Sequence, residues 1–123
     1  MDLNLRGQSV THVCFGAALT LLTSEDYEVR VETDASIKVP GGELALFDPE
    51  SPGAAAVQLV SLVRDVMTSA EVRSAGDLVI SFESGAELTV APHSDYEAWG
   101  LVGPNGRRVV CMPGGEVARW GEQ

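Results

Sequence analysis

The stretch of the chain with the most chemically capable side chains is HSDYEAW, residues 93–99. His93, Asp95 and Glu97 carry metal-ligating groups at alternate positions, a spacing that suits a strand. Pro92 and the Ser-Asp pair favour a turn instead, and a closed metal site needs further ligands at fixed geometry. With only two His and two Cys in the chain, we expect neither a metal site nor a bound cofactor.

A local structural interpretation accounts for the same stretch. Ser94 to Glu97 match the S-x-x-E capping box that begins a helical turn, with Asp95 favourable in its first turn. Tyr96 and Trp99 then lie three residues apart on one side of that turn. The two rings either close an edge of the core or form a contact site, because Tyr and Trp are common interface anchors. We take Asp95, Tyr96, Glu97 and Trp99 as candidate partner-binding residues.

No combination of residues in the sequence indicates catalysis. The chain has no G-x-S-x-G element, and His12 and Cys14 in THVC lack the local signature of a nucleophile with its base. Cys14 and Cys111 are expected to be ordinary buried thiols, since unpaired cysteines are usually buried. We therefore expect a protein that is not an enzyme, with no catalytic residues.

The net charge of −10, from 8 basic and 18 acidic residues, restricts the partners. It argues against direct nucleic-acid binding and against an anionic membrane surface. It suits a basic protein partner, although solubility alone also explains it. Glu28 and Glu32, which alternate with apolar residues, join the candidate contact residues. With neither a membrane-spanning apolar run nor a signal peptide at its start, the protein is expected to be cytoplasmic.

Two nearly matching phrases indicate an internal duplication. Residues 39–47 read VPGGELALF and residues 112–120 read MPGGEVARW, 73 positions apart. Upstream, residues 19–31 align with 78–90 at a shift of 59 positions. The shift between the Pro-Gly-Gly-Glu phrases is 73, so the second copy has 14 extra residues before its phrase. Pro-Gly-Gly presets a turn, and the alternating residues after it indicate a strand.

The duplicated units read as antiparallel β-meanders. We predict units at about 5–47 and 62–120 within a single domain, 1–123, because apolar and polar residues alternate along them. GPNGRR, residues 103–108, predicts a further hairpin. The expected strands are 8–14, 18–23, 27–33, 36–39, 66–73, 77–82 and 86–91.

One helix, at about 53–64, is expected to join the two units. Ala56, Leu59, Val60 and Val63 fall at helical spacing, and Ser51 could cap the helix. The predicted fold class is therefore α+β, mostly β, with two repeated meander units joined by one helix.

The second half of the chain carries segments with a family resemblance. These are GDLVISFESGAELTV (76–90), SDYEAWGLVGPNG (94–106) and VVCMPGGEVARW (109–120). The chain resembles a small, uncharacterised, mainly actinobacterial domain family of unknown function with a Tyr-Glu-x-Trp … Pro-Gly-Gly-Glu … Trp pattern. Its layout is also loosely similar to that of bacterial toxin-immunity proteins. The resemblance implies no catalytic residues.

Three hypotheses for function follow. The first is a non-catalytic binding protein, an immunity-type inhibitor that binds a basic toxin or another basic protein. The second is a small-molecule binding or sensing module with a pocket lined by Trp99, Trp120 and Cys111. The third is a self-associating structural domain that forms a homodimer.

Overall fold

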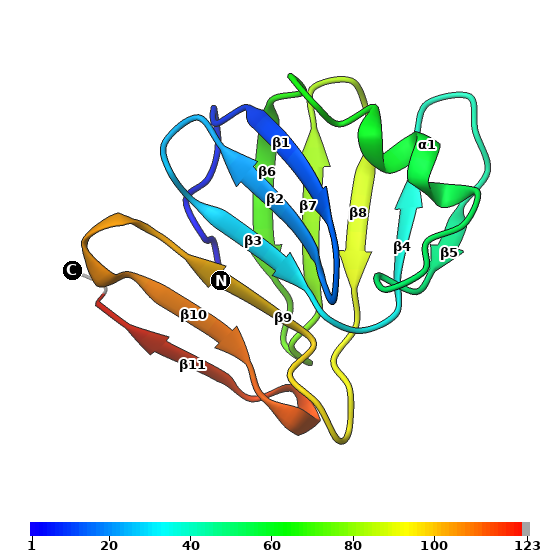
Figure 1. Ribbon diagram of the computed structural model, residues 1–123. Helices are drawn as coiled ribbons and strands as arrows, with labels where there is room; N and C mark the ends of the chain where they lie inside the picture. Colours follow the sequence, from blue (N-terminus) through cyan, green and yellow to red (C-terminus); the bar gives the residue numbers. More distant parts are fainter. Residues whose placement is uncertain (122–123) are drawn as a thin grey trace.

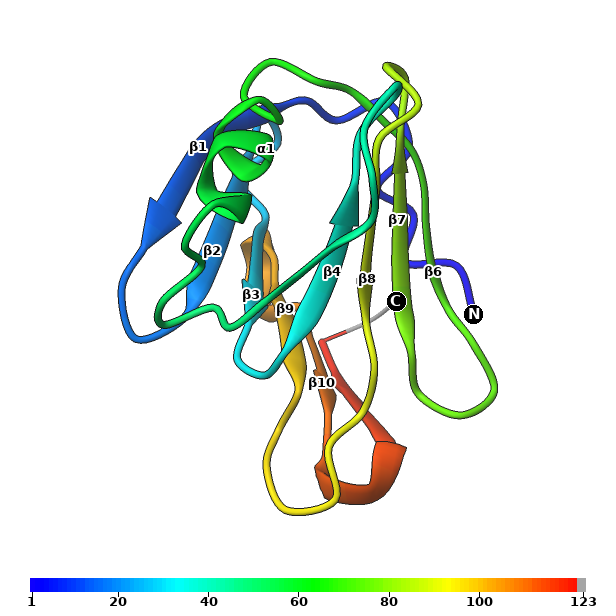
Figure 2. The same ribbon diagram turned by 90° about the vertical axis from the view of Figure 1, so that its right-hand side faces the viewer.

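Two antiparallel β-sheets face each other across one hydrophobic core, with a short helix beside them (Figures 1 and 2). The computed structural model describes residues 1–121. Within them, no helix has the length and apolar character needed to cross a membrane. The elements are β1 (Val10–Phe15), β2 (Leu19–Thr23), β3 (Glu28–Val31), β4 (Ala35–Lys38), β5 (Ala45–Phe47), α1 (Ala55–Val60), β6 (Met67–Val72), β7 (Leu78–Phe82), β8 (Glu87–Val90), β9 (Trp99–Val102), β10 (Arg108–Cys111) and β11 (Val117–Trp120), with 3₁₀ turns at Pro104–Gly106 and Pro113–Gly115.

The sheets have six and five strands. Their orders are β1-β2-β3-β9-β10-β11 and β5-β4-β8-β7-β6, and every pairing is antiparallel. A mostly β, α+β domain with one helix was predicted from the sequence, and this class is confirmed. The seven meander strands lie within the predicted ranges or overlap them, and the GPNGRR hairpin joins β9 to β10.

Each sheet draws strands from both halves of the chain. β1-β2-β3 and β6-β7-β8 are similar meanders, with register irregularities at Val10/His12 in one and Met67/Ser69 in the other. After β3 the chain crosses to the five-stranded sheet, where β4 pairs with β8. After β8 it crosses back, and β9 pairs with β3. The limits of the two predicted repeat units remain a prediction.

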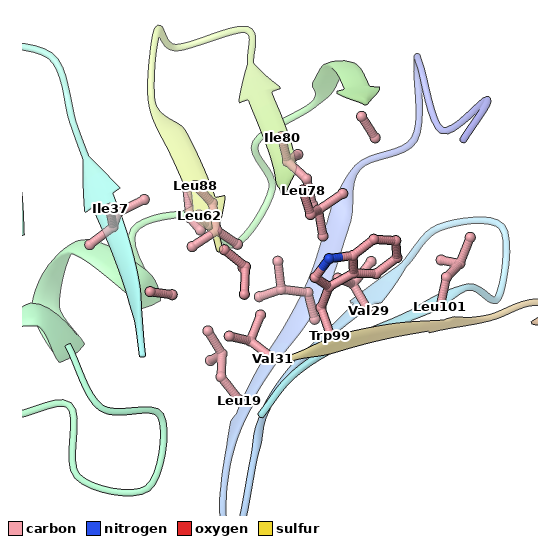
Figure 3. Packing of buried hydrophobic residues seen from close by; sticks show 14 of the residues in the cluster. Leu19, Val29, Val31, Ile37, Leu62, Leu78, Ile80, Leu88, Trp99 and Leu101 are labelled. Carbon is pink, nitrogen blue, oxygen red and sulfur yellow. The ribbon is translucent and has the colours of Figure 1, made fainter. Parts of the chain in front are cut away.

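The core lies where the inner faces of the sheets meet. Leu19, Val31 and Trp99 point from the six-stranded sheet toward Leu78 and Leu88 of the other sheet, and all five are fully buried (Figure 3). Alternation along each strand places these residues inward and their polar neighbours outward. Burial of each such side chain contributes roughly 1.5–3 kcal/mol to folding.

The helix is shorter than predicted and turns a different side to the core. α1 covers Ala55–Val60, and its buried residues are Ala55 and Leu59, whereas Val60 is 51% exposed. The expected cap is wrong: Ala54 is the N-cap and makes no side-chain hydrogen bond. The Ser51 backbone N–H instead donates to the Asp48 carbonyl in a tight turn.

Candidate functional site

An acidic groove lies at one end of the molecule, where the connections between the sheets run. Its volume is about 850 Å³, and none of its described lining residues is basic. These residues are Ala17, Glu32, Glu50, Asp95, Tyr96, Glu97 and Pro113. Three connections supply the four carboxylates, namely β3–β4, β5–α1 and β8–β9.

The exchange of strands between the sheets brings these residues together. Val31 at the end of β3 pairs with Trp99 at the start of β9. One residue further out, the Glu32 N–H donates to the Ala98 carbonyl at 2.9 Å. Glu32 and Glu97 are therefore held on neighbouring strand ends, although 65 positions separate them in the sequence.

The loop of residues 91–98 forms a bend, so the predicted capping box and helical turn are wrong. The Asp95 N–H donates to His93 Nδ1 at 3.0 Å, which takes the place of a cap by Ser94. The Gly114 N–H donates to the His93 carbonyl at 2.8 Å and ties the loop to the second Pro-Gly-Gly turn. These two bonds at His93 hold the bend that stands in place of the expected helical turn.

Tyr96 is the aromatic side chain that the bend presents to solvent. It is 65% exposed, and its ring lies against the His93 imidazole with 5.0 Å between centroids and 45° between planes. One side of the ring is thus supported while the rest remains open to the groove. This is the arrangement expected of an interface anchor, because a partly held aromatic loses little freedom on binding.

Trp99 belongs to the core and not to the contact surface, which corrects its place among the candidates. Its side chain is fully buried, and its Nε1–H donates to the Gly76 carbonyl at 2.9 Å. Its position as the first residue of β9, inward like Val31 opposite it, explains the burial. Tyr96 and Trp99 therefore do not share a side of one turn.

The predicted pocket between Trp99, Trp120 and Cys111 does not form. Cys111 is fully buried beside Trp99, with its Sγ 3.6 Å from the Gly76 carbonyl oxygen. Trp120 is 51% exposed on β11, with the Arg108 guanidinium 5.8 Å above its ring centroid. Burial raises the pKa of the Cys111 thiol, and a backbone hydrogen bond with Ala98 partly offsets this effect.

Glu28 lies apart from the acidic groove. It begins β3, at the opposite end of that strand from Glu32, and pairs in register with Leu22 and Val102. Its half-buried side chain borders a separate small hollow beside His12. Of the six candidate contact residues, the structure thus gathers four, namely Glu32, Asp95, Tyr96 and Glu97.

Glu50 is the groove residue that reasoning from the sequence missed. It lies in DPESPG, a segment that reads only as a loop. Its N–H donates to Asp48 Oδ1 at 2.9 Å, so a tight turn fixes its position. No signal in the sequence connects this turn with residues 95–97, because their proximity depends on the crossing of the chain between sheets.

A second, more apolar groove adjoins the same connections; we call it the β5 groove. Its volume is about 410 Å³, and Leu46 is its large exposed apolar side chain. It is lined by Asp34, Ala35, Ser36, Leu46, Phe47, Asp48, Thr89 and Ala91. Asp34 and Asp48 in its lining stand two residues along the chain from Glu32 and Glu50 of the acidic groove, on the same two connections.

The remaining reactive side chains are dispersed. Within residues 1–121, no group of three or more His, Cys, Asp or Glu side chains could hold a metal ion. Cys14 is exposed on β1, which corrects the expectation of a buried thiol. β1 is an edge strand, and Cys14 pairs there with Thr20 on the outward side of the sheet. His12 Nδ1 lies 3.1 Å from the neighbouring Thr11 hydroxyl.

Comparison with known proteins places the chain in a family without assigning a function. No curated protein and no solved structure matches it. One family model matches residues 1–121, which is nearly the whole chain. The chain belongs to the family of unknown function DUF6188.

Proposed function

We propose that this protein is a non-catalytic binding protein whose acidic groove takes up a basic surface of a protein partner. An immunity-type inhibitor that covers the active surface of a basic toxin is the biological role that suits it best. The observation that carries the proposal is the gathering of Glu32, Glu50, Asp95 and Glu97 around the exposed Tyr96.

The charge of the groove supports a cationic partner. Four carboxylates in one concavity repel each other, and a concave surface of one sign focuses the field outward. A partner that brings Lys or Arg side chains relieves this repulsion and adds charge-assisted hydrogen bonds. The overall charge of −10 acts in the same direction, because it steers a basic protein toward the surface during diffusion.

Tyr96 supplies the apolar part of the proposed contact. Carboxylates alone give strongly salt-dependent and weakly specific binding, since exposed charges are screened by ions. A large amphipathic ring held by His93 offers contact area at small entropic cost. We expect Tyr96 to contribute to slow dissociation and the carboxylates to contribute to fast association.

The test is affinity capture from a lysate of the source organism with matched charge variants. Asp95→Asn with Glu97→Gln removes two charges from the groove. Glu25→Gln with Glu83→Gln removes two charges from the β2–β3 and β7–β8 turns, at the opposite ends of the strands that lead to the groove. The wild type and the control pair should retain one dominant basic protein that the groove pair loses.

Purification of the captured protein completes the test. Tyr96→Ala should speed its dissociation by about 10-fold or more, the range of interface anchors. For an immunity-type role, the wild type should inhibit the activity of the captured protein at equimolar amounts. Equal capture by the groove pair and the control pair would refute the proposal.

A further inference from the structure

The four edge strands of the two sheets are covered by other parts of the chain to different extents. Residues 64–65 cover part of the β1 edge, since the Val10 N–H donates to the Asp65 carbonyl and the Arg64 N–H to the Val10 carbonyl. The N-terminal segment covers the β6 edge through bonds from the Leu3 and Gly7 N–H groups to β6 carbonyls. Within residues 1–121, no strand pairs with the outer edges of β5 and β11. Figure 1 shows β5 at the border of its sheet.

The two uncovered edges differ in what lies beside them. On β11, the Arg108 guanidinium lies over the Trp120 ring, and the Arg119 side chain contacts Met1 Sδ at 3.3 Å. β5 and the residue before it carry two exposed leucines instead, and the β5 groove lies over the outward face of the sheet, where Leu46, Ser36 and Thr89 are in register. Leu44 is 60% exposed and Leu46 is 78% exposed.

The two sheets end in strands that follow the same phrase. The meander β1-β2-β3 is extended by β9, β10 and β11, whereas the corresponding meander β6-β7-β8 is extended by β4 and β5. β5 and β11 each follow a Pro-Gly-Gly-Glu phrase and are the outermost strands of their sheets. A strand placed beside β5 would hydrogen-bond to the β5 backbone and set an apolar side chain against Leu46.

Charge decides between the candidate occupants. A second copy of this chain, paired antiparallel through β5 about Leu46, would bring Glu43 of each copy close to Asp48 and Glu50 of the other. Each copy also has a net charge of −10, so this pairing is electrostatically opposed. A strand from a basic protein meets instead the carboxylates next to β5, among them Asp34 and Asp48.

We propose that β5 is a strand-addition site that takes an extended, basic-flanked segment of the same partner that the acidic groove engages. This inference rests on the proposed function and specifies its mode of docking. Backbone hydrogen bonds along β5 give affinity, and the exposed Leu46 favours an apolar side chain next to it on the added strand. The carboxylates Asp34, Asp48 and Glu50 bind the flanking cations.

The test uses a capped synthetic peptide, Lys-Lys-Val-Thr-Val-Thr-Val-Lys-Lys, as the probe. Leu46→Arg should weaken its binding by about 10-fold or more, as expected for loss of an interface anchor. Val57→Arg is the matched control, because Val57 on α1 is 77% exposed and the variant gains the same charge. We expect it to bind within about 2-fold of the wild type, the usual size of a single remote charge effect.

Two further measurements address the backbone directly. Two modified peptides carry N-methyl groups on alternate residues, so that each has one edge of the extended chain blocked. The peptide whose methylated edge faces β5 should not bind, because a methylated amide cannot donate a hydrogen bond, whereas the other should bind. Hydrogen exchange of residues 43–48 should slow when the unmodified peptide binds. These readouts use the wild-type protein and do not depend on how any variant folds.

The outcomes separate this inference from the proposed function. Equal loss in Leu46→Arg and Val57→Arg, or full binding by both methylated peptides, overturns strand addition. Binding that is lost in the Asp95→Asn, Glu97→Gln pair but kept in Leu46→Arg leaves the acidic groove in place without β5. Loss in Leu46→Arg alone supports β5 and argues against the acidic groove. Absence of binding at millimolar peptide overturns strand addition, while the lysate capture decides the proposed function separately.

Discussion

Alanine at the second glycine of the later Pro-Gly-Gly turn should destabilise the protein far more than alanine at the first. Gly114 and Gly115 are adjacent, and both have positive φ, at 87° and 97°. A Cβ at Gly114 would meet no atom within 4 Å. A Cβ at Gly115 would lie 2.3 Å from the Ala75 carbonyl oxygen, well inside van der Waals contact. Both variants therefore carry the cost of a side chain at positive φ, and only Gly115→Ala carries the cost of a steric clash.

The expected magnitudes follow from these two terms. A non-glycine residue in the left-handed region costs about 1–2 kcal/mol, which is the whole expected effect of Gly114→Ala. Overpacking adds about 1–3 kcal/mol, so Gly115→Ala should cost about 2–5 kcal/mol. Relief by local movement is limited, because residues 75–76 pack tightly against Gly115 at a second point: a Cβ at Gly76 would lie 2.5 Å from the Gly115 carbonyl oxygen.

The assay is equilibrium unfolding in guanidinium chloride, followed by the fluorescence of the buried Trp99. Gly115→Ala should lower the midpoint well below that of Gly114→Ala with little change in slope. Free energies of unfolding that agree within about 0.5 kcal/mol for the two variants would refute the argument, since the steric term would then be absent.

Three further predictions follow from the core and the exposed loop. In the native protein Cys14 should react quickly with a thiol reagent and Cys111 only on unfolding, so rapid labelling of the Cys14→Ala variant would contradict the structure. Trp99→Phe should cost about 2–4 kcal/mol of stability, because it leaves a void and removes the indole donor from the Gly76 carbonyl. Tyr96→Ala should change stability by less than about 0.5 kcal/mol, and equal costs in thermal unfolding would count against this placement. Burial raises the pKa of Cys111 in the folded protein, so the neutral thiol stabilises the fold fully below the unfolded pKa of about 8.5, and this contribution is lost as pH rises toward the folded pKa. In denaturant titrations, alkaline pH should therefore lower the free energy of unfolding of the wild type more than that of Cys111→Ala.

Local patterns were sufficient to predict most strands of this fold. Alternation from Leu19 to Val31 and from Leu78 to Val90 predicted two hairpins, and both form. The helix was placed correctly, but its buried side was not. Apolar residues occur all around the segment, so periodicity alone could not choose Ala55 and Leu59 as the buried pair.

The candidate site was predictable only in part, for a physical reason. The stretch around Tyr96 could be identified from its residue types, and the local capping pattern then gave the wrong conformation. The deciding interactions are long-range, from Gly114 to His93 and from Glu32 to Ala98. Contacts of this kind depend on which strand crosses to which sheet, and no local propensity encodes that choice.

The exchange of strands has a consequence for where function can reside. The connections that cross between the sheets must leave one and enter the other at the same end, so residues 32–34 and 91–98 converge there whatever their sequences are. A short crossing after β3 and a longer one after β8 create a concavity, because the longer loop stands away from the core and is held by the turn at Gly114. The 14 extra residues that the alignment predicts for the second copy fall between Val90 and Pro113, the span that holds β9, so this span supplies both Tyr96 and the strand that fixes Glu32 beside it. The groove thus depends on this span together with Glu32 and Glu50 from two other connections.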